Sequence, residues 1–97
     1  MFKELNPILH SQLRLAVISL LISVKEAEFS FIKEKTNSED SNLRIQLNKL
    51  KEAGYIEVKK QFKDKHPLSL CKISKKGIEA FGEYVKALQS YLQPGNL

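Results

Sequence analysis

Apolar residues follow the period of an α helix in most of the chain and the period of a β strand in one part. The clearest helical segment covers residues 13–24, where apolar side chains fill most of the circumference. A helix of this kind is expected to be covered on several sides. It starts either at residues 6–7, where Asn6 would cap it and Pro7 would lie in the first turn, or after residues 10–11.

A second amphipathic segment, residues 38–54, has an apolar stripe and a polar face. Leu43, Leu47 and Leu50 recur at helical spacing, which predicts that they point into a core. Donors, acceptors and one apolar side chain occupy the opposite face, and these are the types that contact base edges and phosphates. The alternative is an ordinary solvated surface. The candidate contact residues of this face are Ser41, Arg44, Ile45, Asn48 and Lys49.

The segment before this helix predicts a short helix and a turn. Residues 25–28 form a charged break, and residues 29–36 read as a brief extended piece followed by a short helix capped by Ser30. A polar turn follows at residues 36–38. Ser38 or Asp40 is expected to cap the second helix, and Gly54 to follow its end. Two short helices around a turn of about three to four residues match the helix-turn-helix arrangement.

After Gly54 the apolar pattern alternates, which predicts a β-hairpin. Residues 55–62 and 68–74 are the expected strands, and residues 63–67 are the expected polar tip. The phase of the second strand is ambiguous, because Leu68 and Leu70 lie on one face and Cys71 and Ile73 on the other. Burying the first pair would also bury Lys72, and an unpaired charge is costly to bury. We therefore expect Cys71 and Ile73 on the buried face.

The last segment predicts a long helix from about residue 75 to residue 93, with Ser74 as its cap and Gly77 in its first turn. Its apolar residues step by three and four, as in helices that pair with one another. Tyr84 and Tyr91 flank this stripe. A single small domain needs only part of it for its own core, so a homodimer interface is predicted, with intramolecular packing as the alternative. The stripe consists of Ile78, Phe81, Val85, Leu88 and Leu92.

Length and charge narrow the functional class. The chain has 97 residues and a formal net charge of +5, which is consistent with one domain and an anionic partner. The basic excess lies between residues 55 and 76, in and around the predicted hairpin. Lysines there are expected to meet phosphates or the minor groove, whereas the alternative is a solvated hairpin whose charged edges prevent aggregation. These residues are Lys59, Lys60, Lys63 and Lys65.

Several other classes of function are disfavoured. Cys71 is the single cysteine, and neither His10 nor His66 has partners at metal-ligand spacing, so we expect no disulfide, metal or cofactor. Cys71 is interpreted as a small core residue rather than a redox sensor. Residues 13–24 are too short to span a bilayer and lack a cleavage site, which favours a cytoplasmic protein. No phosphate-binding glycine loop, HExxH motif or triad indicates an enzyme.

Two motifs carry a resemblance to a known family. The first joins the second helix to the hairpin as Asp40-x-Asn42-Leu43, then Leu47-x-Lys49-Leu50-x-x-Ala53-Gly54-Tyr55-Ile56, and the second is Ile73-Ser74-x-x-Gly77. In this order they resemble the small single-domain winged helix-turn-helix transcriptional regulators of the MarR/ArsR-like kind, from about residue 5 to residue 92. The cysteine-rich metal motif of ArsR sensors is absent, and Glu39 occupies the place of the usual threonine cap.

The resemblance implies a mainly α fold with a small β-hairpin (α+β), in which residues 1–97 form one winged-helix domain. The helix-turn-helix would cover about residues 30–54, the wing about 55–74 and the dimerisation helix about 75–93. Asn42 and Gln46 also come near the DNA groove by this resemblance. The expected function is sequence-specific binding of double-stranded DNA by a homodimeric transcription regulator. The alternative is a winged-helix module that binds protein and not DNA. The pattern identifies neither an operator nor a small-molecule effector.

Overall fold

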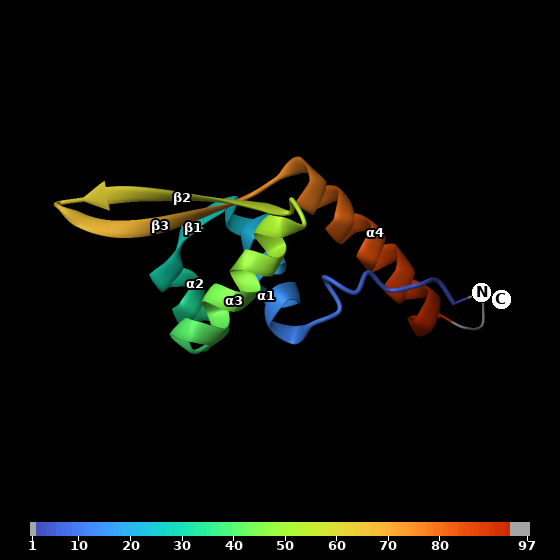
Figure 1. The fold of residues 1–97 in the computed structure, drawn as a ribbon. Coiled ribbons are helices and arrows are strands. Elements are labelled where there is room, and N and C mark those ends of the chain that lie inside the picture. The colour runs from blue at the N-terminus through green and yellow to red at the C-terminus, as the bar shows by residue number, and fades with distance from the viewer. Residues whose placement is uncertain (1, 94–97) are drawn as a thin grey trace.

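The computed structural model describes residues 2–93 (Figure 1). Four helices and a three-stranded antiparallel sheet make up the part of the chain that is described. The expected α+β winged helix-turn-helix is therefore confirmed. The elements are α1 (Gln12–Val24), β1 (Glu26–Glu28), α2 (Phe29–Thr36), α3 (Asp40–Glu52), β2 (Ile56–Lys63), β3 (His66–Ile73) and α4 (Lys75–Leu92).

The chain makes one separate turn before α1. The Asn6 side-chain oxygen accepts hydrogen bonds from the backbone N–H groups of Ile8 and Leu9, at 2.8 and 3.3 Å. Asn6 thus caps this turn, and the long helix begins at Gln12, so the later of the two predicted starts is correct. Leu9 is fully buried at the end of the turn, which ties the N-terminal segment to the core.

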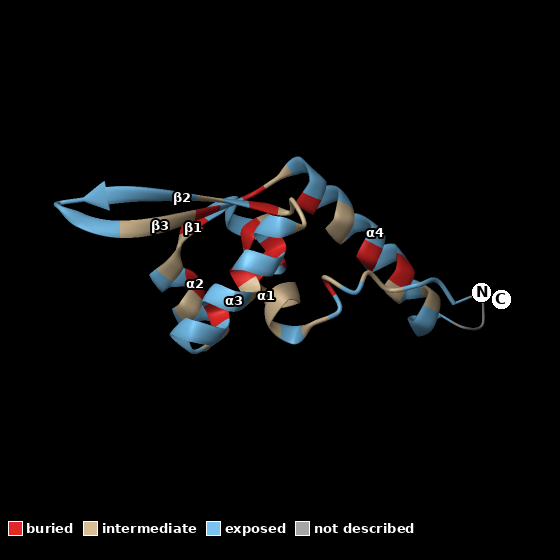
Figure 2. Ribbon diagram, viewed as in Figure 1, coloured by how far each residue is buried: buried red, intermediate tan, exposed pale blue. Residues whose placement is uncertain are grey.

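The core lies where α1, α2, α3 and the inner part of the sheet meet (Figure 2). The predicted stripe of α3 is buried, as are Cys71 and Ile73 of β3, which confirms the chosen phase of that strand. Helix α1 buries three residues and keeps further apolar side chains half-buried around its circumference. Its last residue, Val24, is 40% exposed. The buried residues of α1 and α3 are Val17, Ile18, Leu21, Leu43, Leu47 and Leu50.

The sheet has the order β1-β3-β2. Residues 25–28 were predicted to be a charged break, but β1 lies within them. Ala27 of β1 is opposite Cys71 of β3 and faces the core. The two glutamates on either side of Ala27 lie on the opposite face. A strand of three residues has too short a pattern to be recognised, and it forms here because β3 offers a free edge for hydrogen bonding.

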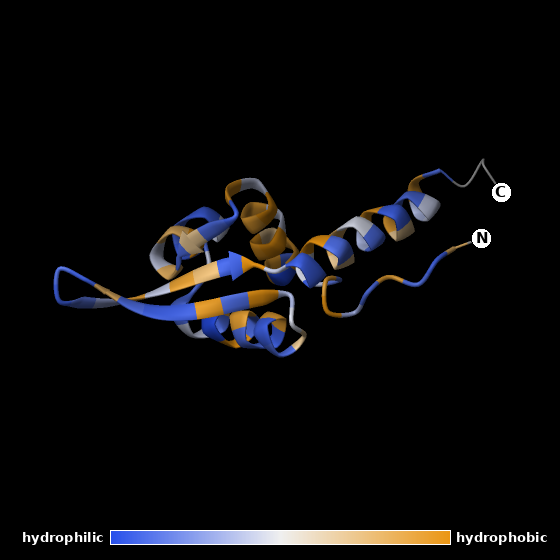
Figure 3. Cartoon of the chain, turned by 90° about the horizontal axis from the view of Figure 1, so that it is seen from above, coloured by the Kyte–Doolittle hydropathy of each residue, from blue (hydrophilic) through white to orange (hydrophobic). Residues whose placement is uncertain are grey.

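The strands of the wing, which we define as β2 and β3, extend further toward the tip than predicted, so the tip is tighter. Only Asp64 and Lys65 connect the strands, and both have positive φ, 51° and 69°. Two such residues form the type of hairpin turn whose twist matches that of the strands. His66 and Pro67 consequently belong to β3 and not to the tip, and Pro67 is opposite Phe62. Figure 3 shows the hairpin extending well beyond the helices.

Neither helix of the helix-turn-helix has the predicted cap. Helix α2 begins directly after β1 and places Ser30 inside the helix, while the residues at the cap positions are Glu28 for α2 and Glu39 for α3. Ser38 instead pairs with Thr36, with 2.8 Å between their hydroxyl oxygens. Asn37 adopts a left-handed conformation at the end of α2 and closes that helix.

Ser74 joins the ends of three elements. Its hydroxyl donates to the Gly54 carbonyl, 2.6 Å away, and accepts from the Gly77 N–H at 2.9 Å, which confirms it as the cap of α4. Gly54 follows α3 with φ of +81°, the left-handed conformation that favours glycine. The end of α3, the end of the wing and the start of α4 are therefore held at one junction.

Helix α4 leaves this junction and projects from the body beside the N-terminal segment (Figure 1). Lys3 connects the two, because its N–H donates to the Ser90 hydroxyl at 3.1 Å and its carbonyl accepts from the Tyr91 hydroxyl at 2.6 Å. Tyr84 was expected to flank the apolar stripe but is buried, with its hydroxyl 3.0 Å from His10 Nδ1. The reason is that the turn before α1 packs under this part of α4 and covers the ring.

The predicted stripe of α4 divides into two parts. Phe81 and Leu88 are half-buried against the core of the same chain. Ile78, Val85 and Leu92, each seven residues apart, are 50%, 37% and 69% exposed. A row of aliphatic side chains along one helix is left uncovered in the single chain. We call these three residues the exposed stripe of α4.

Candidate nucleic-acid interface

Helix α3 presents its predicted outer face to solvent. Leu43 and Leu47 anchor the helix from the other side, so the rotation of α3 is fixed by the core. Ile45 is 53% exposed, which leaves an aliphatic side chain among polar ones. All the predicted contact residues are exposed, namely Ser41, Asn42, Arg44, Ile45, Asn48 and Lys49.

Gln46 lies beside this face and is occupied by other side chains. Its carboxamide oxygen accepts a hydrogen bond from Arg14 Nη1, and its Nε2 donates to Asn42 Oδ1 at 3.0 Å. Arg14 also donates from Nε to the Ile8 carbonyl, 2.6 Å away. This network links α3 to α1 and to the turn before it, and it orients Asn42.

Arg44 is held in place by two neighbours. Its Nε donates to Asp40 Oδ2 at 2.9 Å, and its guanidinium carbon lies 4.3 Å from the centre of the Phe29 ring. The hydrogen bond from Arg44 and its positive charge keep the pKa of the Asp40 carboxyl below its ordinary value, although desolvation acts in the opposite direction. The terminal nitrogens make no hydrogen bond to another described residue, so they can bind a ligand.

The wing carries its lysines on exposed positions. Lys59, Lys60, Lys63 and Lys65 are all exposed, and none forms an ion pair within residues 2–93. Flexible ammonium groups that are not paired within the chain keep their full charge for an anionic partner. Lys60 lies on the side of the wing toward α3, while the other lysines carry the positive charge along the wing and to its tip.

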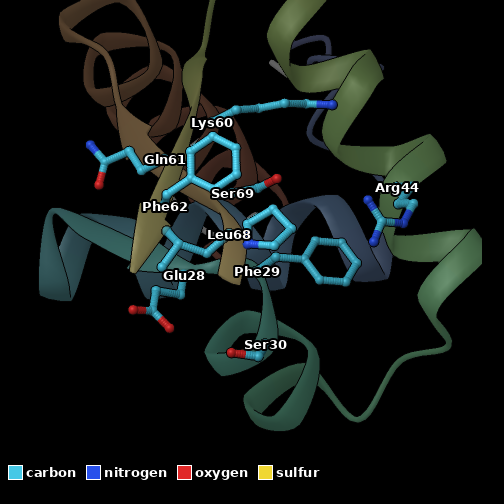
Figure 4. A pocket seen from close by; sticks show the side chains of 10 residues that line it. Glu28, Phe29, Ser30, Arg44, Lys60, Gln61, Phe62, Leu68 and Ser69 are labelled. Carbon is cyan, nitrogen blue, oxygen red and sulfur yellow. The ribbon is translucent and has the colours of Figure 1, made fainter. Parts of the chain in front are cut away.

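A groove separates α3 and α2 from the wing. It consists of two adjoining hollows of about 500 and 310 Å³, which share Phe29, Arg44, Lys60 and Ser69 in their walls. Figure 4 shows side chains from α2, α3, β2 and β3 around the larger hollow. The sequence pattern did not predict this groove, because Phe29 and Arg44 are far apart in the sequence. The signal for it in the sequence was Phe62, an aromatic residue on the same strand face as Ile56 and Val58 but beyond the part of the strand that covers the core.

Other chemistry has little support in the described residues. Burial raises the pKa of the Cys71 thiol to about 11, so the thiol stays protonated and unreactive near neutral pH. Residues 2–93 contain no group of three or more histidine, cysteine or acidic side chains that could hold a metal ion. The same part of the chain contains no helix with the length and apolar character needed to cross a membrane.

Solved structures share this fold. A transcriptional regulator homologue from Pyrococcus horikoshii OT3 superposes with a TM-score of 0.84 at 23% identity, over 93% of this chain and 89% of that one. A MarR-family transcriptional regulator from Silicibacter pomeroyi gives 0.67 at 14% identity, over 90% of this chain and 57% of that one. At these identities the likeness concerns the fold.

Sequence comparison goes further. An uncharacterized protein of Methanocaldococcus jannaschii is 37% identical over 78 residues, which cover 80% of this chain and 85% of that protein. Residues 13–92 match the family model described as a winged helix DNA-binding domain. That match includes α3, the wing and α4, and the family is one of DNA-binding domains and not a class of enzymes. The chain belongs to the winged helix DNA-binding domain family.

Proposed function

We propose that this protein is a transcription regulator that binds specific sites on double-stranded DNA as a homodimer. Helix α3 enters the major groove, and the wing lies on the backbone or in the minor groove. The observation that carries the proposal is the exposed polar face of α3 beside a wing whose exposed lysines are unpaired within residues 2–93, with Lys60 on the side toward α3. Base-edge contacts and phosphate contacts need these two surfaces side by side.

The proposal of a dimer rests on the exposed stripe of α4. Ile78, Val85 and Leu92 are uncovered in the single chain, and an identical stripe on a second copy is a self-complementary partner. Two copies joined in this way present two α3 helices. Their half-sites are expected about 10 bp apart, so that both helices reach successive major grooves on one side of the DNA.

The first test is a titration of the full-length chain with labelled random-sequence duplex at several salt concentrations, followed by selection of the bound sequences. Binding that weakens with salt shows contact with phosphates, and an enriched sequence with two half-sites supports the rest of the proposal. If the protein binds no duplex at any salt concentration, the proposal is wrong and the protein-binding alternative replaces it.

Arg44→Ala should weaken binding to the selected site by about 1 to 3 kcal/mol if the side chain contacts a guanine. Arg44 is suited to this role because Asp40 and Phe29 hold its guanidinium while the terminal nitrogens remain free to bind a base. Arg44→Lys serves as the matched control, since it keeps the charge and removes the planar fork. Arg44→Lys should bind random duplex nearly as well as the parent, and Arg44→Ala should lose much less affinity for random duplex than for the selected site. Equal losses on selected and random DNA would instead identify Arg44 as a phosphate contact.

Lys63→Ala with Lys65→Ala should weaken binding to every duplex, because lysines at the wing tip meet phosphates and do not read bases. The slope of log K against log salt should decrease by about 0.9 for each phosphate that the variant no longer neutralises. Both side chains are exposed, so thermal unfolding should hardly change. An unchanged affinity and salt slope would show that the wing does not touch DNA.

A further inference from the structure

Phe62 is an aromatic side chain that the fold does not use. It is 78% exposed near the outer end of the wing, although it lies on the strand face that buries Ile56 and half-buries Val58 closer to the body. Large apolar side chains at such a position add nothing to the core and favour aggregation. A phenylalanine this exposed near the tip of a lysine-rich hairpin therefore indicates a partner.

The direction of Phe62 indicates where that partner lies. Figure 4 shows Phe62 at the larger hollow of the groove, with Phe29 and Arg44 on the other side. Leu68 and the cross-strand neighbour Pro67 extend the apolar wall on the wing. The hollow of about 500 Å³ thus has apolar side chains on both sides and is open to solvent, and it lies between the wing and the start of α2, with Arg44 of α3 at its edge.

The charges around the groove select an anionic occupant. Lys60 lines both hollows from the wing, and Lys51 lines the smaller one from α3. Among the residues that line either hollow, Glu28 is the one with a carboxylate. The groove thus combines cationic and apolar side chains. A sugar–phosphate backbone is complementary to both, because its anionic phosphates are separated by sugar rings with apolar faces.

We propose that the groove holds the backbone of one strand of duplex DNA, with Phe62 packed against a deoxyribose and Lys60 on the adjacent phosphate. This inference rests on the proposed function. When α3 lies in the major groove and the wing lies toward the minor groove, one DNA strand separates the two grooves. That strand must run between α3 and the wing. The groove between α3 and the wing is where that strand would lie.

The test compares Phe62→Ala and Lys60→Ala in the full-length protein, with random duplex as the probe. Phe62→Ala should weaken binding about tenfold with an unchanged salt slope, because an apolar contact releases no counterions. Lys60→Ala should lower both the affinity and the slope, the latter by about 0.9. Phe62→Leu should keep most of the affinity because it preserves an apolar contact. Phe31→Ala is the control, since Phe31 is also exposed but lies outside the groove.

The outcomes separate this inference from the proposed function. If the parent binds duplex and Phe62→Ala binds equally well, the backbone contact of Phe62 is wrong while DNA binding stands. A lowered salt slope in Phe62→Ala would also overturn it, because the substitution would then act through the lysines. If Phe62→Ala changes the oligomeric state in sedimentation, a second copy of the chain covers Phe62 and not DNA. A parent that binds no duplex overturns both proposals.

Discussion

Val85→Glu combined with Leu92→Glu should convert the protein into a folded monomer. Both residues belong to the exposed stripe of α4, so in the single chain each glutamate would face solvent and the fold should persist. In a dimer the same positions would no longer pack as apolar groups and would bring carboxylates together in an interface. Leu88 is a poorer choice for this test, since it packs partly against the core of its own chain. Sedimentation at micromolar concentration measures the change.

DNA binding should weaken when the dimer is disrupted. A monomer binds one half-site at a time, so its affinity for a two-half-site operator should fall by a factor of about 10² to 10⁴. Affinity for an isolated half-site should remain near that of the parent. Lys86→Glu is the control, because it adds negative charge at an exposed polar position next to the stripe. If the double variant stays dimeric, another surface forms the interface, and α1 is the first candidate.

The parts of the fold that the sequence predicted are those with a long periodic pattern. The leucine stripe of α3 determined which face is buried, and it thereby predicted that Arg44 and Asn48 are exposed. The burial of Cys71 followed from the cost of burying the neighbouring Lys72. These predictions succeeded because burying an apolar stripe is the dominant favourable term for each element.

The wrong predictions for residues 25–28 and for the cap of α2 depend on partners far away in the sequence. Strand β1 forms because Ala27 pairs with Cys71 of β3, and a sequence of three residues is too short to predict that pairing. The predicted cap at Ser30 failed because pairing of β1 extends to Glu28 and leaves Phe29 to begin α2 directly. Asp64 and Lys65 form the tip with positive φ although neither is glycine, so the usual turn residues were missing from the pattern.

The candidate site likewise has a part that the sequence predicted and a part that it did not. The exposed residues of α3 could be identified from the helical period alone, and the wing lysines from the local charge. The groove could not, because it depends on Phe29 packing under Arg44 and on Phe62 facing both from the wing. Periodicity assigns a side chain to a face of its own element, but the distance between two elements is set by tertiary packing.

The same packing makes the junction between α3, the wing and α4 sensitive to small changes. The Tyr55 carbonyl accepts a hydrogen bond from the Ser74 N–H at 3.0 Å, and the Ser74 hydroxyl donates to the Gly54 carbonyl. Gly77 packs directly against this point and is buried. The junction sets how α4 leaves the DNA-binding part, so its geometry would also set the spacing of the two α3 helices in the proposed dimer.

Gly77→Ala should therefore destabilise the protein strongly for a change of one methyl group. A Cβ at this position would lie 2.2 Å from the Tyr55 carbonyl oxygen and 2.9 Å from Ile73 Cδ1. The carbonyl belongs to the backbone and cannot rotate away, so the junction must shift. Overpacking of this kind costs about 1 to 3 kcal/mol, and we expect the upper end because the helix propensity gained by alanine offsets only part of it. For a domain of this size the melting temperature should fall by roughly 10 to 20 °C.

Gly82→Ala is the matched control within the same helix. A Cβ at Gly82 meets no heavy atom within 4 Å, so the substitution should stabilise the protein by about 0.4 to 1 kcal/mol through the helix propensity and reduced chain entropy of alanine. Both variants are compared with the parent by thermal unfolding at several protein concentrations, because dimerisation makes the melting temperature depend on concentration. If Gly77→Ala melts at or above the temperature of the parent, the close packing of Gly77 on the Tyr55 carbonyl does not hold the junction.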